Sequence, residues 1–344
     1  MREGVTKMNT FLSAGLLVFL FNATWGMEYR NNGGYKIPAL GLGTYTVTNE
    51  TELTSALDEA LRIGYRHIDT ASRYKNEHIV GKVLNEWISS GKVKREDLFV
   101  TTKLASADVF PDRVENALKS SLLKLRLDYV DLYLIHFPVA TGVENGADVA
   151  YPTDLVGVWR KMEEQVEAGR AKTIGVSNFN ITQISRIKKI AKIQPANVQV
   201  EMHLYFQQKE LRNFANENNL TVVAYSPLGT PGVNKYFLSK NITQVKLPDI
   251  LHDEVVDKIA QKHKKTNAQI ALRFIIQSGL VAIPKSTNPK RLRENIDIFD
   301  FSLDDEDMQK LADLDKGKKA KIFTMQYIAP NIVENSEYPF HDNI

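Results

Sequence analysis

Short apolar runs recur along the chain, and each is followed by a longer segment whose apolar positions repeat every three or four residues. Short apolar runs of this kind are typical of buried parallel strands, and the longer period is typical of amphipathic helices. Eight runs are predicted strands: 40–43, 66–69, 98–103, 131–136, 173–176, 198–201, 221–225 and 281–284. Helical periodicity follows at 50–63, 76–89, 112–125, 155–168, 182–191, 209–217, 254–263, 268–278 and 289–295.

Eight consecutive strand–helix units predict a closed (β/α)8 barrel, a TIM barrel. No linker rich in Pro, Gly or Ser separates two halves, which favours one barrel over two doubly wound domains. Residues 29–37 contain an Asn-Gly-Gly turn between two β-prone pieces and predict an N-terminal hairpin. We therefore expect residues 27–344 to form a single domain with a long C-terminal loop. In such a barrel the active site lies at the C-terminal ends of the strands.

The first 26 residues have the pattern of a signal peptide rather than of the barrel. Arg2 and Lys7 precede an apolar run at 11–21, and small residues follow up to Gly26. A basic start, a short apolar stretch and small residues at a cleavage site define a secretory leader. We expect cleavage near Gly26 and a protein in the secretory-pathway lumen or outside the cell, without membrane insertion afterwards. A signal anchor or a disordered leader is the alternative, and an unused leader would leave the protein cytoplasmic.

Composition excludes several classes of function. The chain has 344 residues, with 44 Lys and Arg against 41 Asp and Glu, so its net charge of +3 does not favour nucleic acid as a partner. It contains no cysteine, which excludes disulfides, thiol catalysis and cysteine-bound zinc. No cluster of His and carboxylates has metal-ligand spacing, so we predict no metal. Because a secreted chain can be glycosylated, we expect one or two of four sequons to be used: Asn49, Asn180, Asn219 and Asn241.

Three neighbouring predicted strands end in residues that can ionise. Asp69, Lys103 and His136 close the second, third and fourth strands, and Tyr74 follows in the loop after Asp69. Each has an ordinary structural explanation: a carboxylate that caps a helix, a solvated lysine, a satisfied core histidine. An acid, a base and an imidazole at adjacent strand ends of one barrel are harder to explain as packing, and they predict a catalytic site.

Three segments resemble the signatures of the aldo-keto reductases. They read GYRHIDTASRYKNEHIVG at 64–81, LVGVWRKMEEQVEAGRAKTIGVSNF at 155–179 and IPKSTNPKRLREN at 283–295. The tail YPFH at 338–341 also matches, so that the likeness covers nearly the whole chain after residue 28. The resemblance implies a (β/α)8 barrel that binds NADPH in an extended pose and reduces carbonyl groups.

The chemistry of carbonyl reduction agrees with that resemblance. When hydride reaches the carbon, the oxygen becomes negative, so the site needs a proton donor and a group that stabilises charge. Tyr74 is the expected general acid, with Lys103 beside it to lower its pKa. Asp69 is expected to hold Lys103 in place, and His136 to orient the carbonyl oxygen.

The resemblance also implies a set of residues that bind NADP(H). Ser177, Asn178 and Gln199 match the residues that hold the nicotinamide amide, and Tyr225 matches the residue that stacks on its ring. Pairing of cations with a 2′-phosphate is what distinguishes NADP from NAD. The remaining matches are Ser226 and Leu228 for the pyrophosphate, Lys285, Ser286 and Arg291 for the 2′-phosphate, Glu294 and Asn295 for adenine, and Thr44 elsewhere in the cofactor cleft.

The substrate is expected to be a small-molecule carbonyl compound, and three positions predict its size. Tyr45 and Phe137 stand where many aldose-reductase-like members have tryptophan, and they resemble the hydroxysteroid dehydrogenase branch. Ala105 replaces a bulky aromatic residue, so we expect a wide apolar pocket for a bulky ketone. Together with the leader, this resembles the reductases of 3-dehydroecdysteroids. The alternatives are a small-aldehyde or aldose reductase and a non-enzymatic, crystallin-like or structural NADPH-binding barrel. The family implies a monomer.

Overall fold

The computed structural model describes residues 26–239, 241–242 and 246–341. The predicted signal peptide, apart from Gly26, lies outside the described residues. Eight parallel strands form one sheet in the order in which they occur along the chain. They are β3 (Leu42–Gly43), β4 (His67–Asp69), β5 (Phe99–Leu104), β6 (Val130–Ile135), β9 (Ala171–Ser177), β10 (Asn197–Glu201), β11 (Thr221–Tyr225) and β12 (Val281–Ala282).

The sheet closes between its first and last strands. Leu40 forms a parallel bridge with Ala282, and the N–H of Gly41 donates to the carbonyl of Ala282 at 2.9 Å. In return the N–H of Ala282 donates to the carbonyl of Ala39 at 2.8 Å. Because both of its edges are paired, the eight-stranded sheet in the described part of the chain has no open edge. The predicted (β/α)8 barrel is confirmed.

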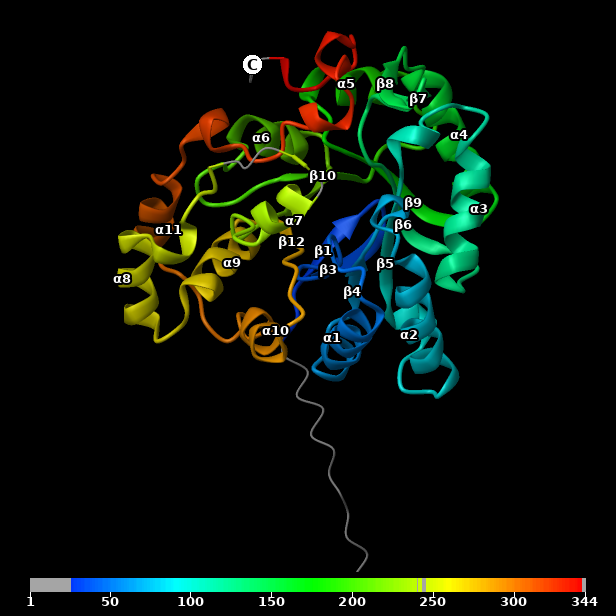
Figure 1. Cartoon of the computed structure of the whole chain (residues 1–344). Coiled ribbons are helices and arrows are strands. Elements are labelled where there is room, and N and C mark those ends of the chain that lie inside the picture. Colours follow the sequence, from blue (N-terminus) through cyan, green and yellow to red (C-terminus); the bar gives the residue numbers. More distant parts are fainter. Residues whose placement is uncertain (1–25, 240, 243–245, 342–344) are drawn as a thin grey trace, which may run out of the picture.

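Helices surround the barrel as a ring (Figure 1). Their first turns have the expected caps: the side chain of Asn49 accepts from the N–H of Glu52, and Asn180 and Thr266 form capping boxes. The helices are α1 (Glu50–Arg62), α2 (Glu77–Ser89), α3 (Val114–Leu125), α4 (Leu155–Glu167), α5 (Ile181–Ile190), α6 (Lys209–Glu217), α7 (Val233–Ser239), α8 (Glu254–His263), α9 (Asn267–Gln277), α10 (Pro289–Ile296) and α11 (Asp305–Ala312).

A hairpin closes the floor of the barrel, as the sequence predicts. β1 (Tyr29–Asn32) pairs antiparallel with β2 (Tyr35–Pro38). Ile37 packs into the barrel interior against strand residues such as Leu132 and Val223, and all three are buried. Nδ2 of Asn32 donates to Thr173 Oγ1 at 2.8 Å. The apolar interior and these buried hydrogen bonds leave the opposite, C-terminal end of the strands as the place for a site.

Three elements lie outside the predicted set. The loop after His136 contains a hairpin, β7 (Ala140–Glu144) with β8 (Ala147–Tyr151), and helices α7 and α11 also escaped prediction. Asn145 and Gly146 both have positive φ at the turn between β7 and β8. Asn-Gly is the strongest short signal for a type I′ hairpin turn, so the sequence did contain a signal for the β7–β8 hairpin.

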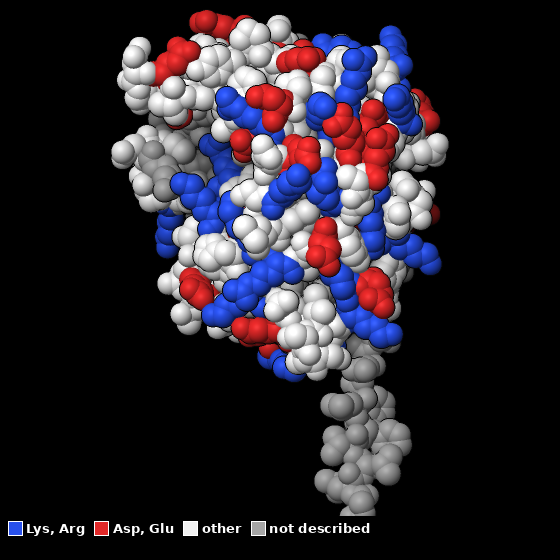
Figure 2. All heavy atoms as spheres, turned by 90° about the vertical axis from the view of Figure 1, so that its right-hand side faces the viewer, with Lys and Arg blue, Asp and Glu red and all other residues white. Residues whose placement is uncertain are grey.

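Lys, Arg, Asp and Glu are mixed over the face that carries α3 and α4 (Figure 2). Ion pairs on these helices include Lys119–Glu115 at 2.7 Å and Lys161–Glu164 at 2.7 Å. Exposed pairs of this kind each contribute little to stability. Within the described ranges, no helix has the length and apolar character needed to cross a membrane.

Candidate active site

The four predicted catalytic side chains come together at the C-terminal end of the barrel. Asp69 ends β4, Lys103 is the last residue but one of β5, and Tyr74 ends the short 3-10 helix Ser72–Tyr74. His136 directly follows β6 rather than ending it. The strands β4, β5 and β6 are neighbours in the barrel, so residues far apart in sequence share one rim (Figure 1).

Asp69 and Lys103 form a buried ion pair. Nζ of Lys103 lies 2.5 Å from Asp69 Oδ1 and donates to the carbonyl of Thr70 at 2.9 Å. The second carboxylate oxygen of Asp69 accepts from Nε2 of Gln199 at 2.8 Å. Burial lowers the pKa of Lys103 from its ordinary value, against the opposing effect of Asp69. A buried charge needs such partners: Asp69 and the carbonyl of Thr70 fix the ammonium group, and Gln199 fixes the carboxylate.

The hydroxyl group of Tyr74 lies 3.4 Å from Nζ of Lys103. Lys103 is expected to lower the pKa of Tyr74, but in the free protein the net shift of that pKa is upward. Burial raises the pKa of Tyr74 well above 10, and the negative charge of Asp69 raises it further. Burial is the main cause, because a buried tyrosinate loses the hydration that stabilises its charge. Tyr74 is therefore protonated at neutral pH, the state that a proton donor requires.

The ring of His136 stands edge-on to the ring of Tyr74, with centroids 5.6 Å apart. Burial lowers the pKa of His136 well below 6.5, and the charges of Lys103 and Arg73 act in the same direction. Its Nδ1 is buried and finds no hydrogen-bond partner in the described part of the chain. The imidazole is therefore neutral at physiological pH and can act as a hydrogen-bond donor to a carbonyl oxygen.

Asn76, a buried residue outside the predicted site, holds the loops around Tyr74. Nδ2 of Asn76 donates to the carbonyls of Thr44 and Val47, each at 2.9 Å, and its Oδ1 accepts from Thr70 at 2.9 Å. Thr44, an expected cofactor residue, is itself buried and donates to the carbonyl of Asp69 at 3.0 Å. Asn76 lies within the first signature, only two residues after Tyr74.

The expected nicotinamide-binding residues also converge, at the ends of β9, β10 and β11. The hydroxyl of Tyr225 donates to Oδ1 of Asn178 at 2.7 Å, and Nδ2 of Asn178 donates to the carbonyl of His136 at 2.9 Å. Asn178 and Ser226 have positive φ. Ser177 and Gln199 are buried beside them. These amide and hydroxyl groups suit the recognition of a carboxamide.

The residues expected at the 2′-phosphate lie between β12 and α10. Lys285 and Arg291 are exposed, and neither side chain has a hydrogen bond or ion pair within the described ranges. Asn288 caps α10 by accepting from the N–H of Arg291 at 3.1 Å. Two free cations beside a helix start fit a phosphate group. Three further expected residues are placed as follows: Ser286 and Asn295 are buried, and Glu294 lies 3.7 Å from Lys290. Leu228 is half-buried against the core.

The three expected pocket residues have different environments. Tyr45 stacks obliquely on Tyr74, with centroids 5.0 Å apart, so it borders the site as expected. Ala105 is half-buried just after β5. Phe137 instead packs against Tyr338 and Phe340 of the C-terminal segment and is only 2% exposed. The C-terminal segment therefore covers Phe137 in the described structure, although the sequence placed it among the residues that shape the substrate pocket.

Three polar residues at the mouth of the site were not anticipated. Tyr236 of α7 lies edge-on to Tyr45 at 5.3 Å, and Tyr327 packs on Phe237 at 5.5 Å. Arg73 immediately precedes Tyr74 and is exposed. The expected apolar pocket is therefore bordered by phenol groups. No sequence signal pointed to Tyr236 or Tyr327, because only the fold brings α7 and the C-terminal segment over the barrel.

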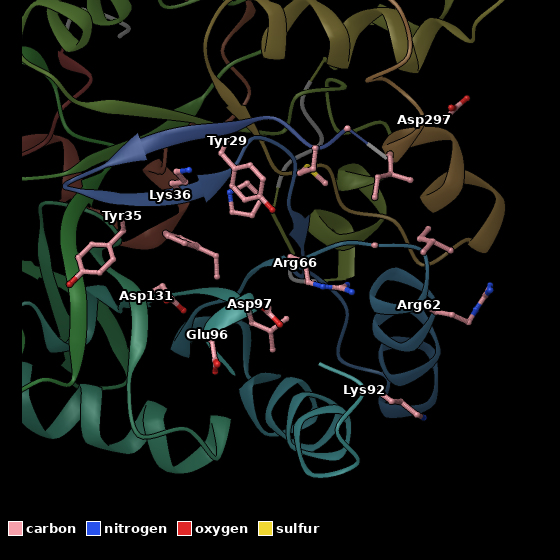
Figure 3. A pocket seen from close by; sticks show the side chains of 18 of the residues that line it. Tyr29, Tyr35, Lys36, Arg62, Arg66, Lys92, Glu96, Asp97, Asp131 and Asp297 are labelled. Atoms are coloured by element: carbon pink, nitrogen blue, oxygen red, sulfur yellow. The ribbon is translucent and has the colours of Figure 1, made fainter. Parts of the chain in front are cut away.

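A separate hollow of about 1230 Å³ lies at the opposite end of the barrel. Figure 3 shows that it is lined by Tyr29, Tyr35 and Lys36 of the hairpin and by residues before β4 and β5, including Arg66 and Asp97. It does not include the four catalytic candidates. Among the described residues, no group of three or more His, Asp or Glu is placed to hold a metal ion.

Comparison with known proteins agrees with this geometry. The model of the aldo/keto reductase family matches residues 39–316. The chain is 42% identical to aldo-keto reductase family 1 member D1 of Rattus norvegicus over 326 residues, covering 90% of this chain and 96% of the relative. It is 40% identical to dihydrodiol dehydrogenase 3 of Bos taurus over 328 residues, covering 92% and 98%.

The structure of the aldose reductase from Schistosoma japonicum superposes with a TM-score of 0.82 at 37% identity, covering 92% of this chain and all of that one. Members of the family are NADP-dependent oxidoreductases that act on carbonyl and alcohol groups. The closed barrel agrees with the relatives in fold, and the matched length and identity are high enough to show the family. This protein is an enzyme of the aldo/keto reductase family.

Proposed function

We propose that this protein reduces a ketone or aldehyde with NADPH and that Tyr74 is its general acid. The observation that carries the proposal is the position of Tyr74, 3.4 Å from a lysine that Asp69 holds at 2.5 Å. The raised pKa of Tyr74 supports it, since the phenol keeps its proton until the carbonyl oxygen becomes an alkoxide. An alkoxide is a stronger base than a phenolate, so proton transfer is then downhill.

NADPH would supply a hydride to the carbonyl carbon. The residues of this chain bind and orient the reactants around that transfer. Neutral His136 donates a hydrogen bond to the carbonyl oxygen, and Tyr74 delivers its proton to that oxygen. Lys103 then stabilises the tyrosinate, because its ammonium group lies within hydrogen-bond distance of the phenol. Tyr225 forms one wall of the nicotinamide site, and Asn178 with Gln199 binds the carboxamide. Lys285 and Arg291 hold the 2′-phosphate.

For the substrate we propose a bulky cyclic ketone, with a 3-dehydroecdysteroid as the leading candidate. Tyr45 and Ala105 support this, because each stands where many aldose-reductase-like members carry a larger aromatic residue. The expected secretory leader supports the hormone-like candidate further. A small aldehyde remains the competing substrate class.

The test compares kcat/KM for 3-dehydroecdysone with that for a short aldehyde and a simple sugar. We expect the ring ketone to be preferred. Tyr45→Trp and Ala105→Trp should lower kcat/KM for the ring ketone and spare the short aldehyde, because discrimination depends on differences in transition-state contacts. A wide preference for the short aldehyde would refute the substrate, and binding of NADPH without any turnover would favour a non-enzymatic barrel.

We also propose that the protein enters the secretory pathway and is cleaved near Gly26. Arg2, Lys7 and the apolar run at 11–21 support this. The N-terminal sequence of the protein made in eukaryotic cells decides the point. A chain that begins at residue 26 or 27 is expected, and a cytosolic chain that retains Met1 or Met8 would contradict the proposal.

A further inference from the structure

Three phenol groups that the proposed mechanism does not use stand around Tyr74. Tyr45 lies 5.0 Å from Tyr74 and 5.3 Å from Tyr236, measured between ring centroids. Tyr45, Tyr236 and Tyr327 belong to one aromatic cluster, in which α7 and the C-terminal segment pack over the barrel end. All three are partly exposed, so their hydroxyl groups border the route by which a substrate reaches Tyr74.

The hydroxyl of Tyr327 donates its own proton to a weak acceptor, Sδ of Met325 at 3.3 Å. It also forms a side-chain hydrogen bond with Tyr45. Burial raises the pKa of Tyr327 to about 12, against the opposing charge of Arg73. Tyr327 therefore remains a protonated donor at neutral pH and can exchange a weak acceptor for a better one.

Arg73 adds a positive charge at the same place. It is exposed, and its guanidinium forms no hydrogen bond or ion pair with any residue in the described ranges. Its charge acts on Tyr74, His136 and Tyr327, which lie on three different segments around the site. Arginine carries five donors in a fixed plane, so its natural partner is an oxygen acceptor.

We propose that Arg73, Tyr236 and Tyr327 form a polar subsite that binds an oxygen-bearing substituent of the substrate. This inference rests on the proposed function and narrows its substrate class. The enzyme would prefer carbonyl compounds that carry a hydroxyl or carboxylate group away from the reacting carbonyl over hydrocarbon ketones of the same size. A hydroxyl and a carboxylate can both accept hydrogen bonds from this subsite. Only the carboxylate can also form an ion pair with Arg73.

The physical reason is the cost of burying donors without acceptors. An apolar substrate would cover these hydroxyl groups and the guanidinium without replacing their water. Sites that are built to hydrogen-bond a substrate oxygen reject analogues that lack it far more strongly than apolar pockets reject a change of size. Each charged hydrogen bond is expected to contribute a factor of about ten or more in kcat/KM.

The experiment uses three benzaldehydes of matched size in the full-length enzyme: 4-methyl, 4-hydroxymethyl and 4-carboxybenzaldehyde, together with their 3-substituted isomers. Kinetics of NADPH oxidation give kcat/KM for each. We expect the hydroxymethyl or carboxyl compound to be favoured over the methyl compound. Arg73→Gln should lower the carboxyl-to-methyl ratio about tenfold, and Arg73→Lys should restore part of it. Tyr236→Phe and Tyr327→Phe should lower the hydroxymethyl-to-methyl ratio.

Comparing ratios between variants removes the intrinsic reactivity of each aldehyde. Lys75→Gln is the matched control: Lys75 is an exposed cation that follows Tyr74 in sequence as Arg73 precedes it, and its loss should leave the ratios unchanged. NADPH affinity, measured by fluorescence, should be the same in all variants. Reduction of all three aldehydes without preference, or equal loss in Arg73→Gln for all of them, overturns the subsite alone. Absence of turnover with every aldehyde overturns the subsite, and absence of turnover with the ring ketone as well overturns the proposed function.

Discussion

Nζ of Lys103 lies 3.4 Å from the hydroxyl of Tyr74, and its stronger contact is the 2.5 Å ion pair with Asp69. In the free enzyme Lys103 is therefore paired mainly with Asp69. The pKa of Tyr74 is raised well above 10. The phenol of Tyr74 is therefore protonated in the free enzyme. The lysine is close enough to stabilise the phenolate once that proton has left.

Tyr74→Phe should lower kcat for carbonyl reduction by at least about 100-fold, because positioned proton transfer contributes about 10² to 10⁴ in rate. NADPH affinity should change little, since the hydroxyl lies outside the expected cofactor cleft. Steady-state kinetics and fluorescence titration with NADPH measure the two effects. Tyr35→Phe, on the hairpin at the other end of the barrel, is the control. Turnover close to that of the unmodified enzyme in Tyr74→Phe would remove Tyr74 from the role of acid.

Lys285→Met combined with Arg291→Met should weaken NADPH binding about 100-fold and NADH binding much less. Two charge-assisted hydrogen bonds to the 2′-phosphate account for this magnitude, and NADH lacks that phosphate. Dissociation constants for both cofactors provide the measurement. Lys290→Met is a matched control on the same helix, because Lys290 is 85% exposed and lies near Glu294. Equal weakening for the two cofactors would place the phosphate elsewhere.

Acidification should destabilise the enzyme through two buried histidines. Burial lowers the pKa of His67 to about 4, and it lowers that of His136 well below 6.5. The unfolded chain binds protons near pH 6.5 and the folded chain does not, so stability falls as the pH drops through 6.5. The His67 contribution between pH 7 and pH 5 is about 2 kcal/mol.

Chemical denaturation at several pH values tests this expectation. His67→Gln and His136→Gln should each flatten the dependence of the unfolding free energy on pH, whatever their effect at pH 7. The surface variant His252→Gln should leave the slope unchanged, because His252 is exposed. Identical slopes in the unmodified enzyme and both buried-site variants would show that neither histidine is held neutral by the fold.

Glu201→Gln should loosen the C-terminal segment. The carboxylate of Glu201 accepts from the N–H groups of Ile322 at 2.6 Å and Phe323 at 2.8 Å, and Nζ of Lys321 lies 3.7 Å away. Removing one partner of a buried pair costs about 3–5 kcal/mol of unfolding free energy. Phe323 packs edge-on to Tyr225 at 5.8 Å, so KM for NADPH should rise as well.

The double variant Glu201→Gln with Lys321→Met provides the control for this anchor. It removes both charges and should recover part of the lost stability, because no unpaired ion remains buried. Thermal and denaturant unfolding measure the recovery. If Lys321→Met lowers the unfolding free energy of Glu201→Gln as much as it lowers that of the unmodified enzyme, the two residues do not act as a pair.

Local hydrophobic patterns in the sequence predicted much of the architecture. The bounds of β11, α6 and α8 agree with the prediction to the residue, because an apolar run or an amphipathic repeat with clear ends specifies each of them. The order of strands followed as well, since repeated β/α units of this length close in one way. The sequence alone predicts that Asp69, Lys103 and His136 lie together, because the C-terminal ends of parallel strands share one rim.

Local sequence patterns thus specify the barrel, its eight units and the rim that carries the catalytic candidates. The electrostatics and the walls of the site arise only when the chain folds. Burial reversed the expected direction of the pKa of Tyr74, and it turned Phe137 inward beneath Tyr338. Packing of α7 and the C-terminal segment brought Tyr236 and Tyr327 together, with Tyr327 within reach of the charge of Arg73. Desolvation and long-range contact depend on which residues become neighbours in space, and no local pattern of hydrophobic positions contains that information.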